Sequence, residues 1–440
     1  MTVPHSSEIA AALAPDVLDR LLRYVRIDTQ SDRAYTQSPS TPGQLELARV
    51  LVSELLALGL ADAAIDALGF VTATLPATVE GAPVIGLLAH VDTSPDAPGA
   101  GVEPLVHADY DGGVIALPRN GTRLDPQRMP ELSAKVGHDI VTTSGDTLLG
   151  ADDKAGVAEV MAAVAYLAAH PELPRPTIRV GFTPDEEIGE GAKVFDLDAF
   201  GADCAYTLDG SEAGEFTDET FTAASANVRI RGVDVHPGFA TGKLVNATRL
   251  AGEILARLPP ELTPEATAER EGFIHVYSVD GSAGAATIRT IVRDFDDDRL
   301  AEHVALLRRV AEEVVASEPR ADVEVDVAAQ YPNMRTFLDE RPEVSAAAEE
   351  ALRREGFEPR RVPISGGTDG SILSARGLPT PNLFTGGHEF HSVREWASLH
   401  EMAAAAATIV ALAQAWTQPD LREAAAAHGT RASPVAVNPR

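Results

Sequence analysis

Two adjacent carboxylates, Asp152 and Asp153, stand between a short apolar run and an alanine-rich pattern typical of a helix. Buried like charges repel each other, so this pair needs a positive charge close by. Lys154 supplies one charge, but its side chain is long and is expected to point away, whereas a metal ion fits directly between carboxylate oxygens. The pair therefore predicts a metal site whose other ligands come from elsewhere in the chain.

Three apolar segments that predict strands each run into residues of the types that bind metals. In chain order they are 84–89 before His90 and Asp92, 177–183 before Glu186 and Glu187, and 205–208 before Asp209. In an open α/β sheet, ligands bind at the carboxyl ends of the strands. We therefore expect these side chains to gather beside the two aspartates.

His90 and Asp92 project to the same side of a strand, because residues two apart face the same way. A metal-bound imidazole usually gives its second N–H to an acceptor, so His90 is predicted as the ligand and Asp92 as the group that orients it. An isolated histidine two residues before an aspartate is more often a core residue at a strand end. The other ligand-type residues nearby favour the metal interpretation.

Glu186 and Glu187 are neighbours whose side chains must diverge. One of them can bind a metal ion while the other faces the cleft as a general base. Taken alone, this acidic pair is typical of a solvated turn. Its position directly after an apolar strand favours the catalytic interpretation.

Two glycine-rich segments near the C-terminus can complete the site. They are Ser365-Gly-Gly-Thr-Asp-Gly370 and Thr385-Gly-Gly-His-Glu-Phe-His391-Ser-Val-Arg-Glu395. Paired glycines let backbone N–H groups approach a ligand closely, and either His388 or His391 can complete the metal shell. Two ordinary glycine-rich turns are the alternative.

Seven motifs, in order, resemble those of the di-zinc exopeptidase family that contains the peptidase T group, carboxypeptidase G and succinyl-diaminopimelate desuccinylase. They are His90-Val-Asp92-Thr93, Gly150-Ala-Asp-Asp-Lys-Ala-Gly156, Phe182-Thr-Pro-Asp-Glu-Glu-Ile-Gly189, Tyr206-Thr-Leu-Asp-Gly210, Val235-His-Pro-Gly238, Gly366-Gly-Thr-Asp-Gly370 and Asn382-Leu-Phe-Thr-Gly-Gly387. The peptidase T group, the tripeptide aminopeptidases, matches best, from about Val17 to about Trp416.

The resemblance implies two Zn²⁺ ions in each subunit. His90 and Asp209 would hold one ion, Glu187 and His391 the other, and Asp152 would bridge them. His391 is preferred to His388 because the family's ligand is followed four residues later by glutamate, as His391 is by Glu395. The family also has a cis peptide between the paired aspartates, which predicts one between Asp152 and Asp153.

The same resemblance implies the catalytic groups. Asp92 would orient His90, and Glu186 would be the base that takes a proton from zinc-activated water and passes it to the leaving amine. His236 would reach across a homodimer to the oxyanion of the tetrahedral intermediate. A turn histidine before Pro237 is the alternative for that residue.

Substrate recognition is also implied by resemblance. The residues that match family positions near the peptide are Asn246, Arg293, Asn333, Arg335, Thr368 and Asp369. One departure stands out, because Ser365 occupies the position where the peptidase T group usually has arginine. Serine cannot replace the charge that would pair with a substrate carboxylate, so the expected preference for tripeptides is weaker than the expectation of hydrolysis.

Periodicity predicts an α/β protein interrupted by an insertion. Helices are predicted at 15–27, 43–58, 343–355 and 399–416, a strand at 379–384 and a site-shaping irregular loop at 95–145. From residue 223 the order changes to β-α-β-β-α-β, which indicates a ferredoxin-like domain. The prediction is a mixed-sheet di-zinc exopeptidase domain at 1–220 and 331–440, with an α+β lid and dimerisation domain at 221–330 and a disordered tail from about residue 420.

Composition limits the partners and the compartment. The 36 basic and 66 acidic residues give a net charge of −30, which argues against nucleic acid and anionic membranes as partners. A single cysteine, Cys204, fits a reducing compartment, and residues 1–14 lack the basic start of a secretory signal. The apolar segment 402–416 is too short to span a bilayer. We therefore expect a cytoplasmic protein.

The leading hypothesis is a zinc-dependent aminopeptidase that releases the N-terminal residue of tripeptides and acts as a homodimer. A dipeptidase, carboxypeptidase or N-acyl amino acid hydrolase of the same family is the second hypothesis. The third is a metal-binding dimeric protein without catalysis, which would be expected to lack a base or a bridging ligand. Neither is missing from the sequence.

Overall fold

The computed structural model describes residues 3–428, which divide into two compact units. The first unit consists of residues 3–218, Met334–Val362 and 368–428. The second unit consists of Glu219–Asn333 and Pro363–Gly367. The short segment Pro363–Gly367 differs from the sequence-based boundaries, which assigned it to the catalytic domain.

An eight-stranded mixed sheet forms the centre of the first unit. Its order is β1 (Ala64–Ile65), β2 (Val71–Leu75), β8 (Ile178–Thr183), β3 (Ile85–His90), β9 (Cys204–Gly210), β16 (Asn382–Phe384), β10 (Glu215–Thr217) and β15 (Arg360–Arg361). The four strands from β8 to β16 are parallel, and every residue of β3 is buried. Parallel strands end at the same edge, so the residues after β3, β8 and β9 lie close together.

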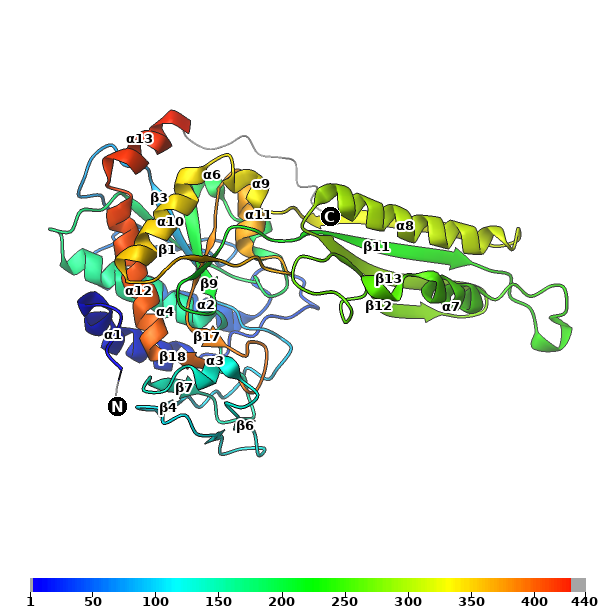
Figure 1. Ribbon diagram of the computed structural model, residues 1–440, viewed down its shortest axis with the longest axis horizontal. Coiled ribbons are helices and arrows are strands. Elements are labelled where there is room, and N and C mark those ends of the chain that lie inside the picture. The colour runs from blue at the N-terminus through cyan, green and yellow to red at the C-terminus, as the bar shows by residue number, and fades with distance from the viewer. Residues whose placement is uncertain (1–2, 429–440) are drawn as a thin grey trace. The chain divides into compact units, whose positions relative to one another are not determined.

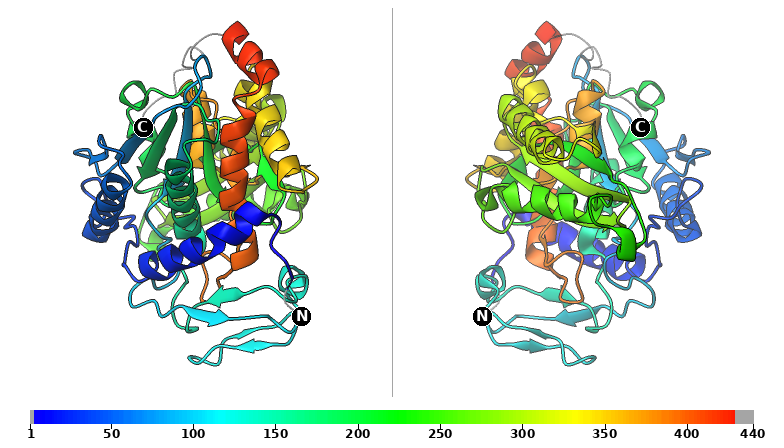
Figure 2. Two further views of the ribbon diagram at one scale, coloured as in Figure 1. Left: turned by 90° about the vertical axis from the view of Figure 1, so that its left-hand side faces the viewer. Right: turned by 90° about the vertical axis from the view of Figure 1, so that its right-hand side faces the viewer.

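The helices of the first unit cover this sheet. Helix α4 (Ala151–Ala169) packs against β3 and β9, and α1 (Glu8–Tyr24) and α12 (Leu399–Ala415) pack on α4 (Figure 2). Both α4 and α12 are buried nearly all round, and their many alanines are small enough to let neighbouring elements pack closely against them. The remaining helices are α2 (Pro42–Ala57), α3 (Pro130–Ser133), α5 (Gly191–Val194), α6 (Leu197–Phe200), α9 (Arg335–Leu338), α10 (Pro342–Arg354), α11 (Asp369–Ala375) and α13 (Pro419–His428).

The predicted irregular loop at 95–145 is in part regular, which corrects the sequence interpretation. It contributes β4 (Leu105–His107) and β7 (Ile140–Thr142) to a small sheet with β17 (Gly387–His388) and β18 (Trp396–Ser398), and a hairpin of β5 (Ile115–Ala116) and β6 (Arg123–Leu124). Tyr110, Leu124, Leu132 and Trp396 are buried in a core of their own. The strands are only two or three residues long, too short to show a periodic pattern, and β7 pairs with β18 far along the chain.

The prediction of a disordered tail from about residue 420 is wrong for residues 421–428. Helix α13 covers them, with Ala425 buried and the Arg422 guanidinium donating to the carbonyl oxygens of Glu80 and Gly81. These tertiary contacts stabilise a segment whose composition alone favours disorder. The rest of the predicted tail, 429–440, lies outside the described residues. Among those that are described, no helix combines the length and apolarity needed to cross a membrane.

The second unit is the predicted ferredoxin-like sandwich. Its elements are β11 (Thr222–Arg231), α7 (Ala247–Arg257), β12 (Phe273–Gly281), β13 (Ala285–Asp294), α8 (Asp297–Ala316) and β14 (Asp322–Tyr331). The strands form an antiparallel sheet in the order β12-β13-β11-β14, and α7 and α8 lie against it (Figure 1). Val228, Ile230 and Ile288 alternate inward to form its core with helix residues such as Leu307. This period-two alternation is what predicted the strands.

Helix α4 contains a buried glutamate, Glu159, whose carboxyl group forms no hydrogen bond with the described residues. Glu159 is fully buried, and neither of its carboxylate oxygens has a hydrogen-bond partner among the described residues. Burial disfavours the charged form, so the pKa of Glu159 lies well above its ordinary value of 4.5. Between about pH 4.5 and the folded pKa, the Glu159 carboxyl is therefore protonated in the folded chain and ionised in the unfolded chain.

We expect Glu159→Gln to make stability less dependent on pH. Because the pKa of Glu159 is higher in the folded than in the unfolded chain, its protonation stabilises the folded chain fully below about pH 4.5. This contribution to the free energy of unfolding is lost as pH rises toward the folded pKa, by about 1.4 kcal/mol for each pH unit. The variant cannot ionise, so its unfolding temperature should exceed that of the wild type at pH 8 but not at pH 4. The exposed Glu46→Gln is the control. This account would be contradicted if the unfolding temperature changed with pH in the same way in the wild type and in Glu159→Gln.

Candidate metal centre

The residues predicted as metal ligands come from five segments of the first unit. His90 ends β3, Asp209 lies in β9, Glu187 follows β8, Asp152 opens α4 and His391 lies between β17 and β18. The structure brings all five together at the carboxyl edge of the parallel strands. Gly156 permits this approach, since a Cβ at that position would lie 1.9 Å from the carbonyl oxygen of Leu208.

The carboxylate of Asp152 faces one imidazole with each of its oxygens. Its Oδ1 lies 3.0 Å from Nε2 of His90, and its Oδ2 lies 3.1 Å from Nε2 of His391. Asp209 Oδ1 lies 3.7 Å from the same nitrogen of His90, and Glu187 Oε2 lies 2.9 Å from that of His391. Each imidazole thus has Asp152 and one further carboxylate beside it, an arrangement suited to two cations bridged by one carboxylate.

The charges at this site call for cations. Burial, followed by repulsion from Asp152, raises the pKa of Glu187 to about 8, and burial is also the largest cause that raises the pKa of Asp209 to about 6. The pKa of His391 is raised to about 11 by its hydrogen bonds to Asp152 and Glu187. In addition, the buried Oε1 of Glu187 has no partner among the described residues. Imidazole and carboxylate donors around such a site fit divalent metal ions such as zinc.

The two adjacent aspartates diverge, and the peptide bond between them is cis, as the sequence predicts. Asp153 is turned inward, where Oδ2 accepts from the backbone N–H of His90 at 3.0 Å and Oδ1 accepts from that of Gly156 at 3.2 Å. Lys154 points away from the pair and donates to the carbonyl oxygen of Ile27 at 2.7 Å. Asp152 is therefore the member of the pair that faces the imidazoles.

Asp92 organises two neighbouring parts of the site. Its carboxylate accepts hydrogen bonds from the backbone N–H groups of Glu186 at 3.0 Å and of Glu187 at 3.1 Å. Nδ1 of His90 lies 3.0 Å from the backbone carbonyl oxygen of Asp92 and 3.4 Å from its carboxylate. The backbone of Asp92 thus orients the histidine, while its side chain fixes the turn that carries both glutamates.

A further acidic side chain, Asp185, holds that turn from the other side. It has a positive φ of 58° and is buried. Its carboxylate accepts from Nε2 of Gln44 at 2.7 Å and from the backbone N–H of Ser40 at 2.8 Å. The turn between β8 and α5, which carries Glu186 and Glu187, is therefore held by Asp92 on one side and by the contacts of Asp185 with Ser40 and Gln44 on the other.

The sequence of this chain is similar to those of known peptidases. A model of the peptidase family M20/M25/M40 matches residues 147–415. A peptidase T of Shouchella clausii is 47% identical over 399 residues, which cover 90% of this chain and 97% of the relative. A peptidase T of Bacillus subtilis is 45% identical over 401 residues, covering 91% of this chain and 98% of the relative.

The chain belongs to this family of peptidases.

The family fold is also seen in a crystal structure of an aminopeptidase PepT from Bacillus cereus. It superimposes with a TM-score of 0.73 at 24% identity, covering 92% of this chain and 99% of the other. This likeness confirms the predicted fold class.

The alternative histidine, His388, lies apart from the site of this M20 peptidase. Its Nε2 is 3.1 Å from Oε2 of Glu401, and its ring stacks on Trp396. Lys135 donates to Glu401 at 2.7 Å and also pairs with Glu212. The Lys135 ammonium already supplies the positive charge of this cluster, so the geometry favours His391 as the metal ligand.

The predicted residues of the second unit are placed as follows. His236 is exposed before the short helix η1 (Pro237–Phe239), and its Nδ1 accepts from the backbone N–H of Gly238 at 3.1 Å. Asn246 caps α7 by accepting from the N–H of Arg249. Arg293 donates to the carbonyl oxygen of Ser365 at 2.8 Å. Their role in binding a peptide stays a prediction.

Four further predicted substrate contacts have internal partners or lie buried. The side chain of Asn333 accepts from the N–H of Thr220 and donates to the carbonyl oxygen of Phe295. Arg335 pairs with Asp218 at 3.1 Å, and Thr183 donates to Asp369 at 2.9 Å. Thr368 is buried and is the N-cap residue of α11, where its backbone N–H donates to the hydroxyl of Ser371 at 3.2 Å. Their contact with substrate also stays a prediction.

Sequence reasoning missed the residues that hold the ligands in place. Asn382 accepts from the backbone N–H of Asp209 at 2.9 Å, and Glu395 accepts from three backbone N–H groups of the segment that carries Asp152. Asp185 was overlooked beside its two acidic neighbours. Only Glu395 gave a signal, through its spacing from His391, and that spacing did not reveal what it touches.

Substitution of the two histidines should separate their roles. We expect His391→Ala to reduce zinc affinity strongly, because it removes an imidazole shared by Asp152 and Glu187. His388→Ala should keep zinc affinity and lower the unfolding temperature, because it disrupts a buried pair with Glu401. Competition with a chromophoric chelator measures the first quantity and calorimetry the second. The reverse pattern would assign the metal to His388.

Proposed function

We propose that the chain is a zinc-dependent aminopeptidase that removes the N-terminal residue from tripeptides. The observation that carries the proposal is the carboxylate of Asp152, which faces His90 with one oxygen and His391 with the other. The relatives of 47% and 45% identity, both named peptidase T, support the reaction and the substrate class.

Two zinc ions are the cofactor in this proposal. His90 and Asp209 would hold one ion, Glu187 and His391 would hold the other, and Asp152 would be a ligand shared by both. When bound, the ions polarise the scissile carbonyl and lower the pKa of a water molecule toward about 7. Asp152, Glu187 and Asp209 would offset three of the four positive charges that two zinc ions bring, so this set of ions and carboxylates would carry a net charge of +1.

Glu186 is proposed as the base, because its neighbour Glu187 is turned toward His391. The backbone N–H of Glu186 is fixed by Asp92, and its side chain has none of the contacts that join the other carboxylates to the imidazoles in the described structure. It is thus free to take a proton from water and to return one to the leaving amine. Asp92 keeps the base and the ligand in a fixed relation throughout the reaction.

A panel of short peptides tests the reaction. A tripeptide with a free N-terminus should release its first residue, and acetylation of that N-terminus should abolish cleavage. Cleavage of the acetylated peptide would favour an N-acyl amino acid hydrolase, release of the last residue a carboxypeptidase, and faster cleavage of dipeptides a dipeptidase. The panel matters because Ser365 lacks the charge that the peptidase T group usually has at this position. Products are identified by mass spectrometry.

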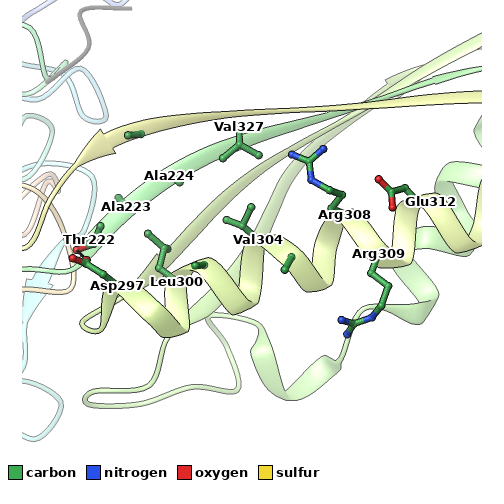
Figure 3. A pocket seen from close by; sticks show the side chains of 13 residues that line it. Thr222, Ala223, Ala224, Asp297, Leu300, Val304, Arg308, Arg309, Glu312 and Val327 are labelled. Carbon is green, nitrogen blue, oxygen red and sulfur yellow. Dashed lines mark hydrogen bonds between the residues drawn. The ribbon is translucent and has the colours of Figure 1, made fainter. Parts of the chain in front are cut away.

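A homodimer is the proposed assembly, and the surface of the second unit supports it. Strand β14 is the outer strand of its sheet, with Val327 39% exposed. A groove of about 450 Å³ runs along α8 beside this strand, lined by apolar side chains such as Leu300 and Val304, with Arg308 and Glu312 toward one end (Figure 3). An uncovered edge strand beside an apolar groove suits pairing with a second copy.

Mixing two inactive variants tests whether His236 acts across this dimer. We expect Glu186→Gln to retain zinc and lose turnover, and His236→Ala to lose turnover as well. A heterodimer of the two has one site with an intact base that receives His236 from its partner subunit. Subunit exchange in equal amounts yields about half heterodimers, so activity should return to about a quarter of the wild-type value. A mixture that stays inactive would place His236 in the site of its own subunit.

The proposed compartment is the cytoplasm. Support comes from Cys204, a free and buried thiol whose pKa is raised by burial. Such a thiol is a poor nucleophile and suits a reducing environment.

A further inference from the structure

Glu395 is a buried carboxylate that binds the segment carrying Asp152. Its Oε2 accepts from the backbone N–H groups of Leu149 at 2.7 Å and Gly150 at 2.8 Å, and its Oε1 accepts from that of Asp152 at 3.0 Å. The side chain is 1% exposed, so water contributes little to these bonds. Hydrogen bonds to a charged acceptor are about twice as strong as neutral ones.

The segment that receives these bonds lies before the regular part of α4. The first N–H groups of a helix lack partners within the helix and are usually satisfied by a side chain just before it. At the start of α4 that position is Gly150, with φ 82° and no side chain to offer. Asp152 and Asp153 also have non-helical backbone angles, so the regular hydrogen bonding of α4 begins after them. Asp153 caps the regular part of the helix through Gly156, whereas Glu395, from a distant part of the sequence, binds the N–H groups that precede it.

The same glutamate belongs to the segment that carries His391. The backbone N–H of Glu395 donates to the carbonyl oxygen of Ser392 at 3.2 Å, in a turn that follows His391 directly. One end of Glu395 is therefore fixed relative to His391, and the other end is bonded to the backbone of Asp152. A short rigid connection joins these two side chains, whose facing atoms lie 3.1 Å apart.

We propose that Glu395 is a positioning residue that holds Asp152 in the bridging orientation, and that zinc affinity depends on it. This inference rests on the proposed zinc-dependent function. Groups that orient metal ligands contribute about 10-fold to 100-fold to metal affinity. Glu395 differs from the usual case because it acts on the backbone of the ligand, so that both oxygens of Asp152 remain available to cations.

Glu395→Gln is the test variant, and Glu401→Gln is its matched control. The amide of glutamine has one acceptor oxygen, and its NH₂ group would oppose one of the backbone N–H donors. Glu401 is equally buried but bonds Lys135 and His388, neither of which faces Asp152. Both substitutions thus remove a buried charge, and only one removes the support of the bridging ligand.

Zinc affinity is measured on metal-stripped protein by competition with a chromophoric chelator, together with hydrogen exchange of residues 149–152 and thermal unfolding of the metal-free form. We expect Glu395→Gln to weaken zinc binding by about 10-fold to 100-fold and to speed exchange of these amides. Glu401→Gln should lower the unfolding temperature and leave both unchanged. Glu395→Asp keeps the charge and should fall between wild type and Glu395→Gln.

Unchanged zinc affinity in Glu395→Gln would overturn the inference, as would an equal loss in Glu401→Gln. Should Glu395→Gln fail to fold, the same comparison between Glu395→Asp and wild type decides the question. The proposed function fails by a different result, in which zinc-loaded wild type cleaves no peptide. Because zinc affinity is measured without peptide, the two failures can be told apart.

Discussion

The repulsion among carboxylates gathered in one poorly hydrated place is the constraint on which the rest of the site depends. Asp152, Glu187 and Asp209 lie around two imidazoles at the edge of the sheet, and burial raises the pKa of the last two carboxylates. Such a cluster is stable only with positive charge inside it. The fold therefore maintains a cluster of carboxylates that attracts cations, and this attraction does not require a substrate or a reaction.

Most of the surrounding hydrogen bonds keep these like charges in place. Asp92 and Asp185 hold the turn of Glu186 and Glu187 from its two sides, and Asp153 receives the backbone N–H of His90. These carboxylates accept hydrogen bonds from backbone N–H groups and, for Asp185, also from the side chain of Gln44, so they fix the positions of neighbouring segments. The acidic motifs of the sequence thus contain two kinds of carboxylate, those that face the imidazoles and those that orient the first kind.

Strand periodicity and residue type, which are local signals, predicted that residues of the first kind gather at one place, and the family resemblance chose among neighbouring acids. Apolar runs before His90, Glu186 and Asp209 were enough to place these residues at one edge of a parallel sheet. Of the second kind, Asp92 was predicted as the residue that orients His90, whereas Asp185 and Glu395 escaped prediction because their contacts, with Gln44 and with Gly150, are distant in sequence. The small sheet within 95–145 and helix α13 escaped for the same reason, since their partners lie elsewhere in the chain.

The two units contain different groups of the predicted site residues. The two imidazoles and the three carboxylates that face them belong to the first unit, whereas His236, Asn246 and Arg293 belong to the second. The second unit has a core and an antiparallel sheet of its own. Ser365 also lies in the second unit, so its difference from the arginine that the family resemblance predicts leaves the set of candidate metal ligands unchanged.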